Sequence, residues 1–303
     1  MQPVHDYYEQ LAPRYDQDRF GNSYGRYIDA MERAILRKWL VAIPPQEVLD
    51  LGCGTGRLLD FAMTGVDASP AMLQVAADKY PDRRLIHSNL PGLEALLAPA
   101  DQGEQSGRSG QIRQNGQPGQ NSQTVPTRLR SHTGASLSTA PENTALASCL
   151  PLRQFQAATC FHVFMHLSPQ VISESLQTLA GLIRSGGSLI IDFPSQQRRA
   201  LKRGRASSTL WHANTAATSA QLQAWAGPAW KIVARRGILF LPVHRLPAFA
   251  RAACQPLDTL LCNSPLGNWA SYHVYLLQRQ PDVAPAPAGA EGSAAAMTTR
   301  SAA

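Results

Sequence analysis

A glycine-rich turn follows a short apolar run near residue 50, and it constrains the fold more than any other feature of this chain. The stretch is EVLDLGCGTG, residues 47–56, and a lone acidic residue, Asp67, comes eleven positions after its last glycine. Glycine lets the backbone turn sharply and approach a ligand without a Cβ in the way. An apolar run that ends in such a turn is typical of a buried strand beside a ligand site. The pattern therefore predicts an α/β domain that binds a small molecule.

Helix-like and strand-like segments alternate along the rest of the chain. Apolar residues at helical spacing end at Pro44–Pro45, a helix is expected to begin at Ser69–Pro70, and another to run from Ser168 to Gly186–Gly187. Short apolar runs, typical of strands, lie at 47–52, 83–90, 156–164 and 188–193, and two more strands joined by a helix are expected in 230–261 and 271–279. This alternation predicts an α/β fold with a doubly wound, mostly parallel sheet that carries helices on both faces.

Two segments have the composition of disordered chain. Residues at about 99–148 are rich in Gln, Ser, Gly and Asn and contain no aromatic residue, and residues 281–303 are similarly poor in large apolar side chains. Such segments bury too little apolar surface to offset the entropy lost on ordering. We therefore expect one folded domain, interrupted by a disordered insertion at about 99–148 and followed by a disordered tail.

Several classes of protein are disfavoured by the sequence. No apolar run approaches 18 residues, and the N-terminal MQPVHDYYEQ does not resemble a secretory signal. The five cysteines form no CxxC pair, which argues against a zinc site or a disulfide framework, so no metal is expected. A reducing cytoplasm is the expected location.

The spacing of the glycines distinguishes between ligand classes. A dinucleotide fingerprint requires glycine at the position of Arg57 and an acidic residue about 20 positions on, whereas Asp67 follows Gly52 by 15. A tight turn without a ligand is the other alternative. The stretch from Asp50 to Gly56 instead resembles the first motif of class I S-adenosylmethionine-dependent methyltransferases, an acidic residue followed by G-x-G-x-G.

The resemblance extends over most of residues 1–280, apart from the insertion. GVDASPAML resembles the second-strand segment of that family, in which the acidic residue, here Asp67, accepts both ribose hydroxyls of the cofactor. Three positions depart from the family pattern: Asn89 and Gln156 stand where Asp is usual, and Ser185 where Pro is common. The resemblance implies a Rossmann-like, seven-stranded sheet in residues 46–280, with a helical lid in residues 1–45.

S-adenosylmethionine is the cofactor that this resemblance implies. The glycine loop would cradle its methionine moiety, and a tyrosine of the lid would lie close to it. The residues expected to bind the cofactor are Tyr15, Asp50, Gly52, Cys53, Gly54, Gly56, Asp67, Ala68, Met72, Asn89, Leu90 and Phe161.

The expected reaction is methyl transfer by direct displacement to a small-molecule or lipid-like acceptor. A general base is needed only for a hydroxyl or a protonated amine, and His162 and His166 are candidates, although either could be a structural histidine. Tyr24, Tyr27 and Arg245 are candidate substrate contacts; the tyrosines could equally pack the lid onto the sheet, and Arg245 could be a surface residue. A non-catalytic relative that keeps the fold as a regulatory module is the alternative function.

Charge is segregated along the chain. The net charge is +7, and residues 193–257 contain ten Lys or Arg but no Asp or Glu, with five of the cations in 198–205. This pattern indicates either a solvated basic face or peripheral contact with an anionic surface through the 198–205 cluster. No RNA-binding module is recognisable, so an RNA methyltransferase is disfavoured, and no obligate protein partner is evident.

Overall fold

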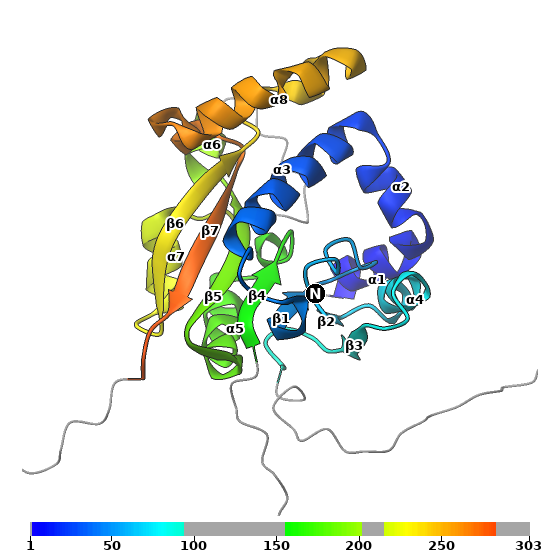
Figure 1. The fold of residues 1–303 in the computed structure, drawn as a ribbon, viewed down its shortest axis with the longest axis vertical. Helices are drawn as coiled ribbons and strands as arrows, with labels where there is room; N and C mark the ends of the chain where they lie inside the picture. The colour runs from blue at the N-terminus through cyan, green and yellow to red at the C-terminus, as the bar shows by residue number, and fades with distance from the viewer. Residues whose placement is uncertain (1, 94–154, 202–214, 283–303) are drawn as a thin grey trace, which may run out of the picture. The chain divides into compact units, whose positions relative to one another are not determined.

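Seven strands form a single sheet in the part of the chain that the computed structural model describes, residues 2–93, 155–201 and 215–282 (Figure 1). Their order is β3-β2-β1-β4-β5-β7-β6; β7 runs antiparallel to both of its neighbours, and all other neighbouring pairs are parallel. The prediction of a doubly wound, mostly parallel sheet is confirmed. The strands are β1 (Val48–Leu51), β2 (Thr64–Asp67), β3 (Arg84–His87), β4 (Phe155–Cys160), β5 (Ile183–Pro194), β6 (Trp230–Ile238) and β7 (Tyr272–Arg279).

Helices α3, α4, α5 and α7 begin at capping side chains. The Ser69 hydroxyl accepts a hydrogen bond from the N–H of Met72 at 3.1 Å, as expected for a helix that starts at Pro70. Thr218 caps the short helix α7 by a reciprocal pair of bonds with Gln221. The α-helices are α1 (Gln2–Leu11), α2 (Tyr15–Phe20), α3 (Ser23–Trp39), α4 (Pro70–Lys79), α5 (Pro169–Leu182), α6 (Gln196–Leu201), α7 (Ser219–Ala226) and α8 (Ala248–Asn263).

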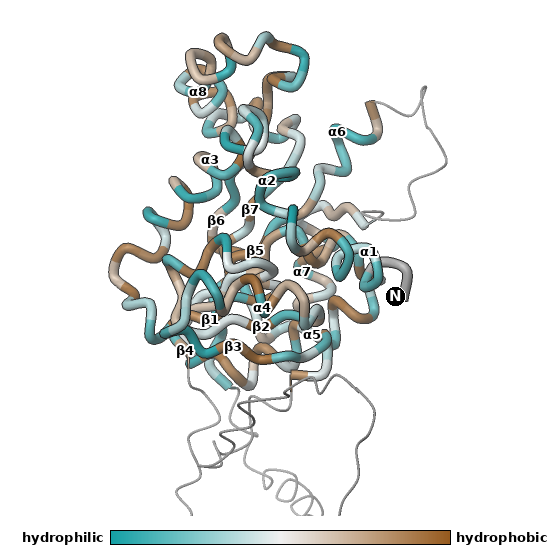
Figure 2. The backbone as a smooth tube through the Cα atoms, turned by 90° about the vertical axis from the view of Figure 1, so that its right-hand side faces the viewer, coloured by the Kyte–Doolittle hydropathy of each residue, from teal (hydrophilic) through white to brown (hydrophobic). Residues whose placement is uncertain are grey.

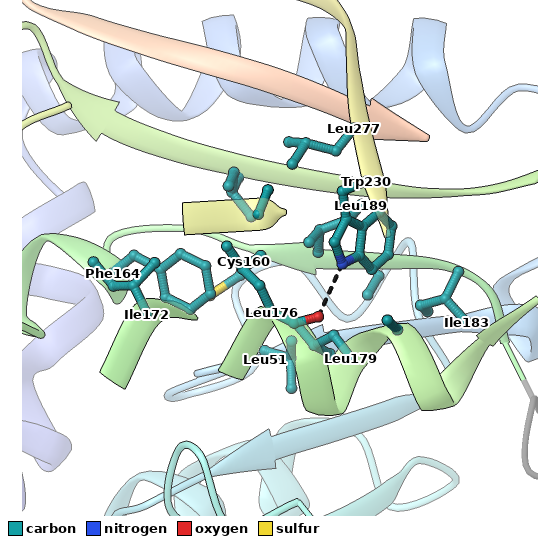
Figure 3. Close-up of a cluster of buried hydrophobic side chains, with 14 of the residues drawn as sticks. Leu51, Cys160, Phe164, Ile172, Leu176, Leu179, Ile183, Leu189, Trp230 and Leu277 are labelled. Carbon is teal, nitrogen blue, oxygen red and sulfur yellow. Dashed lines mark hydrogen bonds between the residues drawn. The ribbon is translucent and has the colours of Figure 1, made fainter. Parts of the chain in front are cut away.

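The central strands β1, β4 and β5 are buried on both faces of the sheet, and residues along a strand alternate between the two. In β5, Leu189 and Ile191 belong to a core covered by α5 and α7, whereas Ile190 packs with side chains of α3, α4 and α8. Figure 3 shows the first of these cores, where the indole N–H of Trp230 donates to the carbonyl oxygen of Leu176 at 2.9 Å. The two-sided burial explains why the strands have near-continuous apolar sequences.

The structure differs from two of the expectations for secondary structure. Helix α5 ends at Leu182 and not at the glycine pair, because residues from Ile183 onward already belong to β5. Pairing with β4 shifts register there: Phe155 lies opposite Ile183, but Ala157 lies opposite Ser188, so the glycines sit in an irregular part of the strand. The segment between the glycine turn and Asp67 is a few residues shorter than is usual in the resembling family, which implies a clipped first helix, but in the structure it forms turns.

The insertion expected at about 99–148, and residues 283–303 of the expected tail, lie outside the described residues. In the described part of the chain, no helix has the length and apolar character needed to span a bilayer. After β3 the chain passes to β4 on the other side of β1, so the strand order reverses between β1 and β4. Ligands of open α/β sheets bind at the carboxyl ends of the strands beside such a reversal.

Candidate active site

A pocket opens at the carboxyl ends of β1, β2, β3 and β4, beneath the N-terminal helices α1 and α2. Its lining is mostly apolar and comes from loops far apart in the sequence. Eleven of the sequence-predicted site residues line it: Tyr15, Gly52, Gly54, Asp67, Ala68, Met72, Asn89, Leu90, Phe161, His162 and His166.

Asp67 ends β2 and organises the floor of this pocket. One carboxylate oxygen accepts the N–H of Gly54 at 2.7 Å, and the other accepts the N–H of Ser69 at 2.9 Å. Burial raises the pKa of Asp67, against the lowering effect of these backbone donors. Because an ionised carboxylate has about four lone-pair sites, it can still accept a hydrogen bond from a ligand.

The glycines of the turn have different structural roles. All three have positive φ, which favours glycine. A Cβ added to Gly52 would lie 2.2 Å from Cγ2 of Val163, whereas one added to Gly54 would meet no atom within 4 Å and would point into open space. Gly56 lies outside the pocket, close to Leu59 and Tyr80. Gly54 is therefore the position that leaves room for a ligand.

Asp50 and Cys53 lie beside a smaller cavity adjoining the main pocket. The carboxylate of Asp50, on β1, is buried and accepts a hydrogen bond from the Thr159 hydroxyl at 2.6 Å. Burial raises the pKa of Asp50 to about 6, although the bond from Thr159 opposes the shift. Asp50 thus lies beneath the turn as a buried acid close to the ligand site.

Arg57 stands where a dinucleotide fingerprint would have its last glycine, and it ties the turn to the N-terminal helix α3. Its guanidinium contacts Oδ1 of Asp29 and Oε2 of Glu32, each at 2.7 Å, and lies 4.4 Å from the ring centroid of Phe20. A second tie joins α2 to the turn, where the Thr55 hydroxyl donates to Asp16 at 2.6 Å. Four lid residues thus hold the loop that follows β1.

His162 follows β4 and lies between two buried carboxylates. Its Nε2 is 2.8 Å from Oε1 of Glu32, and its Nδ1 is 3.4 Å from Oδ2 of Asp192, on β5. Its backbone N–H also donates to Asp192 at 2.6 Å. Burial alone lowers the pKa of His162, but the two carboxylates outweigh it and raise the pKa above its usual value. The arrangement favours an imidazolium, with Nε2 facing Glu32 and Nδ1 close to, but not hydrogen-bonded to, Oδ2 of Asp192.

His166 has a different environment at the pocket wall. Its Nε2 lies 3.3 Å from the hydroxyl of Tyr8, on α1, and the two rings meet edge to face with centroids 5.9 Å apart. Tyr15, from α2, adds its ring beside Tyr8 at 6.0 Å. Burial raises the pKa of both tyrosines, so their hydroxyls stay neutral at ordinary pH.

The three candidate substrate contacts lie apart from this pocket. Tyr27 is buried, and its hydroxyl donates to the buried Asp258 of α8 at 3.0 Å. Tyr24 packs edge to face against His244, with ring centroids 6.2 Å apart, and Arg245 is exposed. None of the three lines the pocket beside the glycine loop.

Sequence reasoning missed Glu32, Arg57 and Asp192 as members of the site. Glu32 offers a signal in retrospect, because it stands between Met31 and Leu36 on the buried face of an amphipathic helix, where a carboxylate needs a partner. Asp192 interrupts the apolar run of β5 in the same way. Their partners were not identifiable from local sequence.

A family of methyltransferase domains matches residues 22–229, which include the glycine turn, Asp67 and the loop after β4. The chain belongs to this family. The expected membership of a methyltransferase family is thereby confirmed.

Similarity to individual proteins is partial in sequence and broader in fold. Over 81 residues the chain is 37% identical to trans-aconitate 2-methyltransferase of Rhodopseudomonas palustris, covering 21% of this chain and 32% of that enzyme. Over 117 residues it is 28% identical to a mitochondrial methyltransferase of Saccharomyces cerevisiae, covering 32% and 25%. The matches thus span about a quarter to a third of these curated relatives.

A solved structure resembles the chain along most of its length. It is magnesium protoporphyrin IX methyltransferase from Synechocystis PCC 6803 with bound SAH, and it superposes with a TM-score of 0.52 at 15% identity, covering 92% of this chain and 99% of the other. At that identity the likeness shows the fold, and it agrees with the seven-stranded sheet described above.

Proposed function

We propose that this protein transfers the methyl group of S-adenosylmethionine to a small-molecule or lipid-like acceptor. The observation that carries the proposal is the position of Asp67, whose carboxylate lies on the pocket floor beside Gly54 and has lone-pair sites beyond those that face the backbone donors. A vicinal diol such as the cofactor's ribose matches two adjacent acceptors. When bound, the cofactor supplies a methyl group on a positively charged sulfur that a nucleophile can displace directly.

The residues around Asp67 fit the remaining parts of the cofactor. Gly54 leaves open space next to the backbone, where a methionine moiety would lie. Met72, Leu90 and Phe161 provide an apolar slot for the adenine ring, and the Asn89 amide oxygen can accept from its amino group. The departure from the usual Asp at position 89 removes a charge but keeps the acceptor.

Of the two candidate bases, His166 is the better placed to accept a proton. His162 is held between the carboxylates of Glu32 and Asp192 as a cation, and a protonated imidazole has no acceptor nitrogen. His166 lines the pocket and has one ring nitrogen next to the Tyr8 hydroxyl. His162 would instead contribute a fixed positive charge at the pocket wall and position the backbone after β4.

The lining favours an apolar acceptor over a nucleic acid. Tyr8 and Tyr15, which the lid places over the pocket, are neutral and largely apolar, and His5 stays close to the carbonyl oxygen of Ala68 at 2.9 Å. In the basic cluster at 198–205, Arg198 donates to the carbonyl oxygen of Trp269, and residues 202–205 lie outside the described part of the chain. Contact of that cluster with an anionic surface stays a proposal.

Calorimetry on the full chain tests cofactor binding, with S-adenosylmethionine and S-adenosylhomocysteine as separate ligands. We expect both to bind, and absence of heat with either would contradict the proposal. A screen of cell extract with cofactor labelled in the methyl group then tests catalysis. Label transferred to a low-molecular-weight or lipid fraction is the expected result. Binding without transfer to any fraction would favour a regulatory relative, and transfer to RNA would contradict the acceptor class.

A further inference from the structure

The outer face of α8 carries a strip of exposed apolar side chains. Phe249, Leu257 and Leu260 are exposed to 86%, 52% and 67%, and helical spacing places Ala253 and Pro256 between them on the same side. The opposite side of the helix buries Asp258 and Cys262 against the core. We call these five exposed residues the outer strip. In Figure 2 the tube of α8 accordingly carries both apolar and polar colours.

Exposed large hydrophobic side chains gather in and just after α8. The described residues include eight of them: three, Phe249, Leu257 and Leu260, belong to the outer strip, and two more, Leu266 and Trp269, lie in the short helical turn that follows α8. Scattered exposed hydrophobic residues are normal, but a contiguous group marks an interaction surface. The strip therefore indicates a partner that offers an apolar environment for these side chains.

The stretch of chain that carries the strip has almost no acidic residues. Asp258 is the only acidic residue between Phe193 and Pro281, and it is fully buried, accepting from the Tyr27 hydroxyl and from the N–H of Leu241. Arg245, just before α8, is exposed. The surface around α8 thus combines apolar and cationic side chains with no exposed carboxylate from this stretch.

The strip lies at the same end of the sheet as the pocket, where the parallel strands have their carboxyl ends. Because β5 and β6 are both antiparallel to β7, β6 runs parallel to β5, and α8 follows the carboxyl end of β6. The pocket lies at the carboxyl ends of β1 to β4. In Figure 1, α8 and the lid helix α3 lie beside each other at that end of the sheet. A surface that contacts the strip would therefore approach the protein at the end of the sheet where the pocket lies.

We propose that the outer strip of α8 docks the protein onto an anionic lipid bilayer. An interfacial helix inserts its apolar face between headgroups and gains from cations close to anionic lipid. A second copy of the chain fits less well, because a symmetric pairing of two strips would bring like charges together. The docking does not depend on the methyl acceptor, so it stands or falls separately from the proposed function.

Co-sedimentation of the full chain with lipid vesicles tests the proposal. We expect binding to vesicles that contain phosphatidylglycerol, weaker binding to pure phosphatidylcholine, and a decrease with added salt. The double variant Phe249→Ser/Leu260→Ser should lower the partition coefficient at least about tenfold, because two large apolar side chains no longer leave water. Its cofactor affinity and melting temperature should match those of the parent, since both side chains are exposed.

Val41→Ser is the matched control. Val41 is 83% exposed but lies in the turn after α3, before the amino end of β1. Because it lies at the amino ends of the parallel strands and not at their carboxyl ends, vesicle binding should be unchanged. Equal partition of the parent and the double variant would overturn the proposal, as would equal binding to neutral and anionic vesicles. If the double variant does not fold, Phe249→Ser alone decides in the same assay. A dimer in sedimentation equilibrium that the same substitutions dissociate, without vesicle binding by the parent, would assign the strip to a second copy and overturn it too.

Discussion

Oε1 of Glu32, on helix α3, lies 2.8 Å from Nε2 of His162, which follows β4 and forms part of the pocket wall. The contact links a residue of the lid to a residue of the pocket across 130 positions of sequence. Arg57 contacts the other oxygen of Glu32, although its approach at 2.7 Å lacks hydrogen-bond geometry and leaves that oxygen without a hydrogen-bond partner. Lid, glycine turn and pocket wall therefore share one buried cluster of charges.

The cluster makes stability depend on pH in a definite direction. Burial alone raises the pKa of Glu32, but His162 and Arg57 outweigh it and lower the pKa from 4.5 to about 2. The stability that ionised Glu32 contributes is therefore present above about pH 4.5 and is lost as pH falls toward 2. For His162, whose pKa is raised above 6.5, the contribution is complete below pH 6.5 and is lost as pH rises through the raised value.

The first prediction is that Glu32→Gln costs the most stability between about pH 4.5 and 6.5. In that window Glu32 is ionised and His162 is protonated, so the substitution removes the full interaction, about 3 kcal/mol from the shift of Glu32. Denaturant unfolding of parent and variant from pH 4 to 9 measures the difference, which should shrink at the alkaline end. A difference that stays constant over this range would mean that the two side chains are not coupled as described.

Local sequence was enough to predict the strand before the glycine turn and the helix that begins at Ser69–Pro70, although not the turns between Gly56 and Asp67. The turn, Asp67 and the cap at Ser69 lie within 20 residues of one another, and their roles follow from backbone conformation and side-chain chemistry at neighbouring positions. The sheet followed from alternating strand and helix signals for a similar reason. The predicted end of α5 at the glycine pair was wrong, because Ile183 pairs with Phe155 and so already belongs to β5, and that pairing is a tertiary contact.

The charge cluster was beyond prediction from local sequence. Glu32, Arg57, His162 and Asp192 come from four separate segments, and only the order of strands in the sheet brings them together. Tyr27 shows the opposite difficulty. Its aromatic ring with a polar tip fits a substrate site as well as a buried hydrogen bond, and only the position of Asp258 reveals the second role.

The second prediction distinguishes the roles of Gly52 and Gly54, which follow β1. Gly52→Ala should destabilise the fold, because its Cβ would lie 2.2 Å from a methyl of Val163, whose branched side chain is stiff, in addition to the strain of positive φ. Gly54→Ala adds about 1–2 kcal/mol of the same strain but no clash. It should instead lower cofactor affinity at least about tenfold, because the methyl group occupies ligand space. Denaturant unfolding and calorimetry measure the two effects, and a reversed pattern would contradict the geometry.

The third prediction concerns Tyr27, whose hydroxyl donates to a carboxylate that is fully buried. Tyr27→Phe removes one donor from Asp258 and leaves the bond from the N–H of Leu241. Loss of a hydrogen bond to a charged group should cost about 1.5–3 kcal/mol of unfolding free energy. Cofactor affinity should not change, because the ring lies outside the pocket. A variant of parental stability with impaired methyl transfer would return Tyr27 to the substrate site.

The last prediction tests Asp67, on which the cofactor assignment depends. Asp67→Ala should weaken binding of S-adenosylmethionine at least about tenfold, because charge-assisted hydrogen bonds to the two ribose hydroxyls are lost. S-adenosylhomocysteine has the same ribose and should lose affinity equally. The structure adds an effect on the protein without ligand, since the N–H groups of Gly54 and Ser69 lose their acceptor. Unfolding free energy should fall by about 2 kcal/mol.

Two further variants make the result specific. Asp67→Asn keeps one acceptor oxygen and loses the charge, so its affinity for both ligands should lie between those of the parent and the alanine variant. Asp82→Ala removes an exposed carboxylate just before β3, outside the pocket, and should change neither affinity nor stability appreciably. Calorimetry with both ligands on the parent and the three variants, each shown to be folded by thermal unfolding, gives the affinities to compare. If Asp67→Ala binds both ligands as tightly as the parent, the ribose is held by other residues and Asp67 serves only to shape the turn.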